Sequence, residues 1–248
     1  MQLKDATVLI VDDEPVLCEI KSAWLTRLVG RVLVANNGAE ALEVLAANPV
    51  DLVITDIRMP VMDGVTLLKK ITASGKPQPR VIFITGFSDF DPRDAYDLGA
   101  DAILEKPMER DGLLQVVKRS LMTRHELWRT PVDVMPAAVL HSSFPSLAIA
   151  LQEQKIAFGR GGFCIAVSQD LHEGPIGILL EFHEDRCLLQ GQGMVRWISP
   201  AEGLAGVELL YVAPASYEWM AELAEHNETT AYIPRSPSAQ QSLSAKTA

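Results

Sequence analysis

Five polar residues in the N-terminal half have the types needed for chemistry on a phosphoryl group. They are Asp12, Asp13, Asp56, Thr85 and Lys106, and each lies at or just after the end of an apolar run. Carboxylates that are brought together repel one another unless a cation lies among them, and hard oxygen ligands without His or Cys suit Mg²⁺. With the metal, a carboxylate nucleophile, a hydroxyl and an ammonium would form a phosphoryl-transfer site, with an aspartyl phosphate as the product.

The elements that must position these residues follow from the apolar pattern of residues 1–121. Apolar runs at 7–11, 31–35, 51–55, 80–85 and 101–105 predict parallel strands that are buried on both faces. Amphipathic segments at 15–29, 38–48, 65–74, 93–98 and from 110 onward predict the helices between them. This alternation predicts a doubly wound α/β fold with a five-stranded parallel sheet, in which the carboxyl ends of the strands form the ligand crevice.

The motifs VLIVDDEP, LVITDIRMPVMDG, FITG and ILEKP occur in that order, each at a predicted strand end. Through them, residues 5–121 closely resemble the receiver domains of two-component response regulators, which have a flavodoxin-like fold. The resemblance implies that Asp56 accepts the phosphoryl group and that Asp13 and Asp56 bind Mg²⁺ directly. It further implies that Asp12 acts at the edge of the metal, often through water, and that the backbone carbonyl of Arg58 completes the protein ligands.

The same resemblance implies roles for the remaining polar residues. Thr85 and Lys106 are expected to contact the phosphoryl group, and the Lys106–Pro107 peptide bond is expected to be cis. Gly64 is expected to supply backbone freedom in the loop after the acceptor. Ile103 lies where such domains usually carry Tyr or Phe, so switching is expected to rest on the loop at residues 86–92, with Phe87 or Phe90 as a partial substitute.

The second half of the chain has a different pattern. Residues 122–131 are predicted to be a linker or an extension of the last helix, and alternating apolar residues with glycine turns follow from 132. They predict a small antiparallel β-barrel, closed by a helix at 214–226, over residues 132–231. Residues 232–248 are rich in Pro, Ser, Ala and Gln and are predicted to be a disordered tail.

The segments GRGGFCIAV, GMVRWIS and GLAGVELLYV make residues from about 129 to 213 resemble a PilZ domain. This resemblance implies a site for cyclic di-GMP made by an arginine arm and a polar turn. In the arm, Arg129 matches the second arginine, while His125 stands at the first with Arg124 beside it. In the turn, Arg160 could contact a phosphate, but Ala157 and Gly159 replace the expected hydrogen-bonding residues.

Two functional hypotheses follow. In the first, a phosphorylation-controlled adaptor binds a protein partner through its degenerate PilZ-like domain. In the second, the chain integrates phosphorylation with cyclic di-GMP, which Arg124, Arg129 and Arg160 would anchor. An enzymatic output is not expected, because no Ser-His-Asp or Cys-His arrangement can be placed in the second half.

Composition and charge limit the expected binding partners and the expected cellular location of the protein. A net charge of -10 argues against binding to nucleic acid, so no DNA partner is expected. Three cysteines, an odd number, indicate reduced thiols in a cytoplasmic protein, and no apolar run suits membrane insertion. The expected partners are a sensor histidine kinase or phosphotransfer protein, a downstream protein, and a second copy paired through a receiver face with Arg93, Asp97 and Arg119.

Overall fold

The computed structural model of the chain describes residues 3–74, 78–86, 90–133, 135–168, 170–225 and 229–237. The chain divides into two compact units. The first comprises Met1–Asp91 and Leu98–Thr123, and the second comprises Pro92–Asp97 and Arg124–Ala248. Within the described ranges, no helix has both the length and the apolar character needed to cross a membrane.

The first unit is built on a five-stranded parallel sheet with the strand order β2-β1-β3-β4-β5. Its strands are β1 (Thr7–Val11), β2 (Arg31–Ala35), β3 (Leu52–Asp56), β4 (Arg80–Thr85) and β5 (Ala102–Glu105). The order reverses between β1 and β3, which is the switch point where doubly wound sheets open a crevice. The predicted α/β fold is therefore confirmed, and its crevice lies between the two strands that carry the aspartates.

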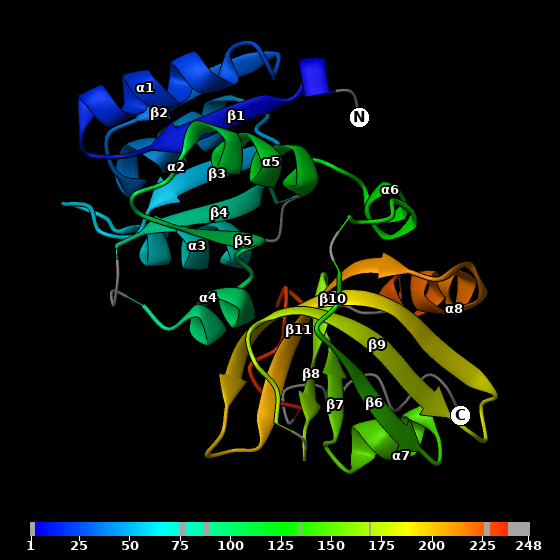
Figure 1. Cartoon of the computed structure of the whole chain (residues 1–248). Coiled ribbons are helices and arrows are strands. Elements are labelled where there is room, and N and C mark those ends of the chain that lie inside the picture. The colour runs from blue at the N-terminus through cyan, green and yellow to red at the C-terminus, as the bar shows by residue number, and fades with distance from the viewer. Residues whose placement is uncertain are drawn as a thin grey trace. The chain divides into compact units, whose positions relative to one another are not determined.

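Helices cover both faces of this sheet (Figure 1). A short 3-10 turn, η1 (Leu3–Asp5), precedes β1, and the helices are α1 (Pro15–Leu25), α2 (Gly38–Ala47), α3 (Gly64–Ala73) and α5 (Arg110–Ser120). Ile10, Ile54 and Ile82 pack in one buried cluster with Leu25 of α1 and Leu113 of α5. Residues next to them along a strand point to the opposite face, so both faces of the strands are buried and only apolar residues are tolerated there.

Local sequence fixes where α2 begins. The Asn37 side chain accepts hydrogen bonds from the backbone N–H groups of Ala39 and Glu40. The Glu40 carboxylate in turn accepts from the backbone N–H of Asn36 at 2.9 Å. These bonds satisfy donors that have no partner inside the helix, as in a capping box.

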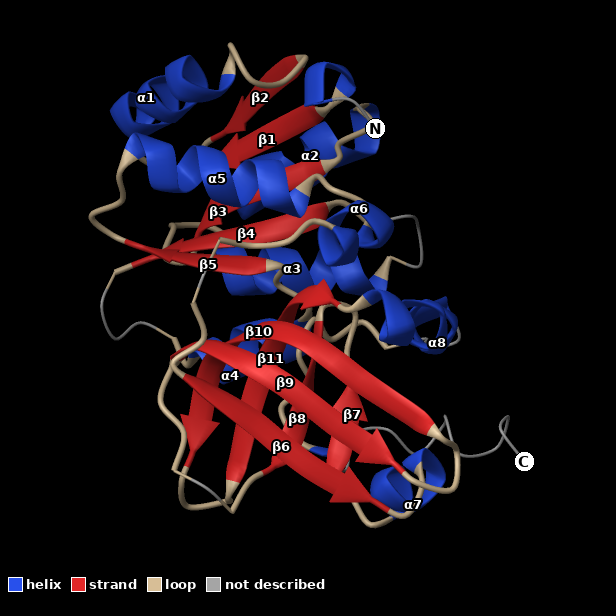
Figure 2. Cartoon of the chain, turned by 45° about the vertical axis from the view of Figure 1, so that its right-hand side comes forward, coloured by secondary structure: helices blue, strands red, loops and turns tan. Residues whose placement is uncertain are grey.

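The second unit contains a six-stranded curled sheet with the order β6-β9-β10-β11-β8-β7 (Figure 2). Its strands are β6 (Ala138–Phe144), β7 (Ile156–Phe158), β8 (Gly162–Ala166), β9 (Gly174–Phe182), β10 (Cys187–Ser199) and β11 (Leu204–Val212). Its helices are α4 (Pro92–Leu98, of which Leu98 belongs to the first unit), α6 (Arg124–Arg129), α7 (Leu147–Gln152) and α8 (Pro214–Glu225).

Strand β6 makes this sheet mixed, so the prediction of a purely antiparallel barrel is wrong. β6 pairs parallel with β9, whereas the pairs β9–β10, β10–β11, β11–β8 and β8–β7 are antiparallel. The segment between β6 and β9 contains α7, β7 and β8, and it brings the chain back to run in the direction of β6. A parallel pair requires such a crossover connection.

The predicted linker forms a helix of its own. α5 ends at Ser120, where the backbone N–H of Met122 donates to the carbonyl of Arg119 in a tight last turn, and α6 starts afresh at Arg124. Leu127 and Trp128 of α6 are buried, and α6 packs against β11 and α8. The alternative of one extended helix is therefore wrong, because the apolar side of α6 belongs to the core of the second unit.

The predicted tail also begins too early. Tyr232 and Ile233 are buried, and the backbone N–H of Arg235 donates to the Asp97 carboxylate at 2.8 Å. Residues 229–235 therefore belong to the packed second unit. Residues 238–248 of the predicted tail lie outside the described residues.

Candidate functional site

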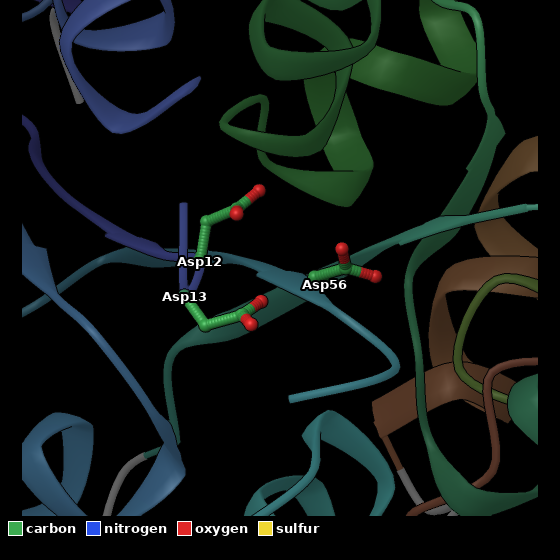
Figure 3. Close-up of side chains that lie close together, drawn as sticks. All are labelled: Asp12, Asp13 and Asp56. Carbon is green, nitrogen blue, oxygen red and sulfur yellow. The ribbon is translucent and has the colours of Figure 1, made fainter. Parts of the chain in front are cut away.

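Three aspartates meet at the carboxyl edge of the parallel sheet (Figure 3). Asp12 and Asp13 follow β1, and Asp56 ends β3, which pairs with β1 in a register that places Val11 beside Thr55. One carboxylate oxygen from each aspartate lies within 4.8 Å of the others. Asp12 and Asp56 are buried and Asp13 is exposed, so the cluster opens to solvent on the side of Asp13.

Asp56 is held by donors from two other segments. The Lys106 ammonium forms a hydrogen bond and ion pair with Oδ2 of Asp56, and the backbone N–H of Arg58 lies 3.3 Å from Oδ1. Partial burial lowers the pKa of Lys106, but the hydrogen bond and the charge of Asp56 outweigh it and raise the pKa overall. Lys106 therefore stays charged at neutral pH and lies where it would meet a negative group on Asp56.

The backbone around Lys106 orients it toward this edge. Its N–H donates to the carbonyl of Thr85 at 2.7 Å, and the Lys106–Pro107 peptide bond is cis, as expected. The Thr85 hydroxyl instead donates to the carbonyl of Gly86 at 2.9 Å. Among the described contacts none joins this hydroxyl to Asp56, so Thr85 lies at the predicted edge but is engaged within its own loop.

The position expected to hold a switching aromatic residue is occupied by Ile103, which pairs with Phe83 in the neighbouring strand. Phe90 packs edge-on against Phe83, with 6.5 Å between the ring centroids. An aromatic ring near this edge of the sheet therefore comes from the loop before α4 rather than from β5. Phe87, the other candidate, lies outside the described residues.

Gly64 is required for a different reason from the one expected. Its φ is not positive, and the residue of this loop in the left-handed region is Val61, with a φ of 69°. A Cβ on Gly64 would instead lie 2.3 Å from the carbonyl oxygen of Asp56. Glycine therefore allows the start of α3 to approach the end of β3 closely.

Lys21 is a member of this site that the sequence analysis did not identify. Its ammonium pairs with Oδ2 of Asp12, and both side chains are almost completely buried. The backbone N–H of Glu14 donates to the other oxygen, Oδ1, at 3.0 Å. The signal was available, because Lys21 lies on the buried stripe of α1 between Cys18 and Leu25, where an apolar residue is expected.

The donor set suits Mg²⁺. The cluster offers only hard oxygen atoms, and in the part of the chain that the structure describes no contact engages the Asp13 carboxylate. Asp13 and Asp56 are thus the residues that would hold the ion, and the contribution of the Arg58 carbonyl stays a prediction. When bound, the ion would supply positive charge that offsets the negative charge of a phosphoryl group.

The three arginines of the second unit that were expected to bind a dinucleotide lie in two separate places. Arg124 donates to the carbonyl of Ala224 at 3.1 Å, and the Arg129 guanidinium lies 4.0 Å from the centroid of the Tyr217 ring. Arg160, in the turn between β7 and β8, donates to the carbonyl of Thr230 at 2.9 Å.

A pocket of about 190 Å³ lies between α6 and α8 and is lined by Arg124, His125, Trp128 and Tyr217, among others. This volume is below the roughly 300–1,000 Å³ typical of sites for drug-sized ligands. The pocket is therefore small for a ligand of that size, although Arg124 and His125 line it.

The glycine turn at 159–161 is covered by the C-terminal segment of the same unit. The backbone N–H groups of Arg160 and Gly161 donate to the carbonyls of Ala231 and Tyr232 at 2.8 and 2.9 Å. A Cβ on Gly159 would lie 2.3 Å from the Tyr232 carbonyl oxygen, and one on Gly161 would lie 2.1 Å from its ring. The glycines therefore make room for residues 231–232, which occupy the surface that the turn would offer to a ligand.

The Tyr232 side chain is anchored below this turn. Its hydroxyl donates to the buried Glu208 carboxylate at 3.0 Å, and Glu208 accepts from Arg196 at 2.7 Å. Its backbone N–H donates to the carbonyl of Tyr96 in α4, and the two tyrosine rings stack with 6.1 Å between centroids. Burial raises the pKa of Tyr96 to about 12, so this ring stays neutral at physiological pH.

Comparison with known families assigns the first unit. Residues 8–118 match the family described as the response regulator receiver domain. This match spans the β1 to α5 region and contains every residue of the acidic cluster. The N-terminal half of the chain is therefore a response regulator receiver domain.

Relatives match about half of this chain. The transcriptional regulatory protein GlrR of Escherichia coli (strain K12) is 35% identical over 136 residues, which cover 53% of this chain and 31% of GlrR. The autoinducer 1 sensor kinase/phosphatase LuxN of Vibrio harveyi is 38% identical over 111 residues, which cover 45% of this chain and 13% of LuxN. The chain thus spans about a third or less of these relatives.

Among solved structures, a response regulator receiver domain protein from Clostridium thermocellum is 30% identical. The match covers 47% of this chain and 94% of that chain, with a TM-score of 0.43.

Proposed function

We propose that the chain is a two-component response regulator that accepts a phosphoryl group on Asp56 and thereby controls the second unit, a PilZ-like domain that acts by binding a protein. The observation that carries the first part is the pairing of Lys106 with Asp56 beside the open carboxylate of Asp13. This arrangement combines a nucleophile, a fixed positive charge and oxygen ligands for a divalent cation.

The residues divide the reaction among them. An Asp56 oxygen attacks the phosphorus of a phosphohistidine or an acyl phosphate, the new O–P bond forms, and the donor's bond to phosphorus breaks. Lys106 moves from the carboxylate to the phosphoryl oxygens and stabilises their charge. The Thr85 hydroxyl, which donates to Gly86 before the reaction, can turn to donate to a phosphoryl oxygen.

The chain itself offers a path from this site to the second unit. Thr85 ends β4, and residues 86–91 lead from it directly into α4, which belongs to the second unit. A rearrangement of Thr85 would act on α4 through this covalent connection, of which residues 87–89 lie outside the described residues. Because α4 contacts Tyr232, and Tyr232 covers the glycine turn, a shift in α4 would change the surface of the second unit.

Arg93 and Asp97, which were expected to pair two copies of the chain, make contacts within the second unit instead. These contacts favour signalling within one chain over a homodimer. Arg93 pairs with Glu202, and Asp97 accepts from the backbone of Arg235, all within the second unit. A homodimer through Arg93 and Asp97 would have to break these contacts. A protein partner is also favoured over cyclic di-GMP, because residues 231–232 cover the turn that the nucleotide would need.

The test is phosphorylation by acetyl phosphate with Mg²⁺, followed by intact mass spectrometry. Wild-type protein and the exposed control Asp5→Asn should gain one phosphoryl group, and Asp56→Asn should gain none. Asp13→Asn should react far more slowly because it removes the open carboxylate. A phosphoryl group that still appears in Asp56→Asn would refute the assignment of the acceptor.

A further inference from the structure

The buried Lys21–Asp12 ion pair affects what the acidic pocket can bind. Asp12 is 0% exposed and Lys21 is 2% exposed, so neither charge is screened by water. Breaking a buried pair leaves one charge without solvent or partner, which is strongly unfavourable. Lys21 therefore stays with Asp12 when a cation or a phosphoryl group enters the pocket.

The geometry divides the three aspartates into two kinds. Both oxygens of Asp12 already accept hydrogen bonds, one from Lys21 and one from the backbone of Glu14. The Asp13 carboxylate is exposed and is the open one. Asp12 would thus act on an ion through its charge rather than as a direct ligand. Asp13 is the residue that can offer a ligand oxygen without losing a hydrogen bond.

The charges of the pocket can be counted. Asp12, Asp13 and Asp56 contribute three negative charges, and Lys21 and Lys106 contribute two positive charges, which leaves one negative charge. Without Lys21 the pocket would carry two negative charges, so a divalent cation would be attracted more strongly. With Lys21, a pocket that holds Mg²⁺ and a dianionic phosphoryl group on Asp56 is neutral, whereas without it that state keeps a negative charge.

We propose that Lys21 is a built-in counter-ion that weakens the binding of Mg²⁺ to the unphosphorylated pocket and stabilises the phosphoryl-bearing state. This inference rests on the proposed function of Asp56. Lys21 is a positioning residue, since it acts through Asp12 and touches neither the acceptor nor the ligand. Lys21 thereby lowers the affinity of the empty pocket for Mg²⁺ and raises the stability of the pocket that holds both Mg²⁺ and a phosphoryl group.

The experiment measures two affinities of the full chain by calorimetry, that of Mg²⁺ alone and that of beryllofluoride, an anionic phosphoryl analogue, in saturating Mg²⁺. In Lys21→Met, Mg²⁺ should bind on the order of tenfold more tightly and beryllofluoride on the order of tenfold more weakly, which is the effect of one charge in a partly screened site. Lys21→Arg, which keeps the charge, should resemble wild type. Lys69→Met, at an exposed lysine of α3, is the matched control and should change neither affinity.

Opposite changes separate this role from a structural one, because a distorted pocket would bind both ligands more weakly. Unchanged or weaker Mg²⁺ binding in a folded Lys21→Met protein would overturn the inference and leave the function of Asp56 intact. Wild-type protein that binds neither Mg²⁺ nor beryllofluoride would overturn both.

A second variant covers the case in which Lys21→Met does not fold. The double variant Asp12→Asn/Lys21→Met removes the buried pair and keeps the charge of the pocket, so its Mg²⁺ affinity should remain within about threefold of wild type. An affinity of the double variant that is more than about tenfold tighter would contradict the role of charge.

Discussion

At the scale of single residues, the receiver site is organised by two lysines with different tasks. Lys106 is partly exposed and pairs with Asp56, the proposed acceptor, so it can transfer its hydrogen bond to an incoming group. Lys21 is buried and pairs with Asp12, so it cannot leave. In the proposed function, Lys106 thus responds to phosphorylation of Asp56, and Lys21 sets the net charge of the pocket in which it occurs.

Replacement of Lys106 tests the first task. Lys106→Met should weaken beryllofluoride binding by roughly a hundredfold, because removing one preorganised donor to a developing charge has an effect of about that size. Mg²⁺ binding should not weaken, since the variant removes a positive charge from the pocket. Titration calorimetry measures both, with the exposed Lys118→Met as the control. Equal beryllofluoride affinities in Lys106→Met and wild type would contradict the role given to Lys106.

The pKa of Lys106 sets the pH range of its contribution to stability. The pKa is raised in the folded state above its ordinary value of 10.5, so the stabilisation is fully present below 10.5 and is lost as the pH rises through the folded value. The difference in thermal midpoint between wild type and Lys106→Met should therefore be constant from about pH 7 to pH 9 and shrink above about pH 10.5. A difference that changes between pH 7 and pH 9 would show that another group controls it.

At the scale of elements, the glycine turn between β7 and β8 is a docking point for the chain's own C-terminal segment. Its backbone donors bind residues 231–232, and its missing side chains leave room for Tyr232. The features that make the turn unsuitable for a dinucleotide are therefore the features that hold the segment in place.

Two glycine substitutions test this packing. Gly159→Ala should destabilise the second unit by about 1–3 kcal/mol, because its Cβ would force the Tyr232 backbone to move. Gly112→Ala is the control, since nothing lies within 4 Å of its Cβ in α5. That control should stabilise the first unit by about 0.5–1 kcal/mol through helix propensity. Thermal unfolding measures both, and a neutral Gly159→Ala would mean that residues 231–232 do not rest on the turn.

The reactivity of the Cys164 thiol tests the packing of β8, which follows the glycine turn. Burial in β8 raises the pKa of this thiol to about 12, so almost none of it is thiolate at pH 8. Cys187 is only partly buried and should react first with a thiol reagent under native conditions. Rapid labelling of Cys164 at pH 8, mapped by peptide mass spectrometry, would contradict the packing of the second unit.

The elements also show which features could be predicted from sequence. Parallel strands buried on both faces appear as continuous apolar runs, so β1 to β5 and the residues at their ends were found from the sequence. Strand β6 was missed, because it is an edge strand whose His and Ser residues break the apolar pattern. Lys21 was missed because a lysine on a helix is usually solvated, although its place on the apolar stripe of α1 was a signal that this one is buried.

At the scale of the whole molecule, the chain combines a receiver domain with a second unit. The sequence of this unit suggests binding of cyclic di-GMP, but its structure does not favour such binding. The three candidate arginines are divided between α6 and the glycine turn, and each already contacts another part of the second unit. The resemblance of the second unit to PilZ domains stays a prediction from the sequence. The packing of the C-terminal segment on the turn could not be predicted from the sequence, because the contacting residues lie far apart in the chain. The hydrogen bond from Arg160 to Thr230, for example, spans 70 residues.

Titration with cyclic di-GMP tests this view of the second unit. Calorimetry should detect no micromolar binding to wild-type protein, because the turn is covered by residues 231–232. Micromolar binding that is lost in Arg129→Ala would contradict the adaptor hypothesis and favour the integrator of phosphorylation and nucleotide. Arg186→Ala, at a surface turn, is the control for a general loss of positive charge.

The central claim is that Asp56 of the receiver domain accepts the phosphoryl group with the help of Mg²⁺. The most direct measurement is the binding of beryllofluoride to the full chain by calorimetry, with and without Mg²⁺, in wild type and Asp56→Asn. Stoichiometric binding that requires Mg²⁺ and is absent in Asp56→Asn is the predicted result. Binding that persists in Asp56→Asn, or that does not depend on Mg²⁺, would contradict the account.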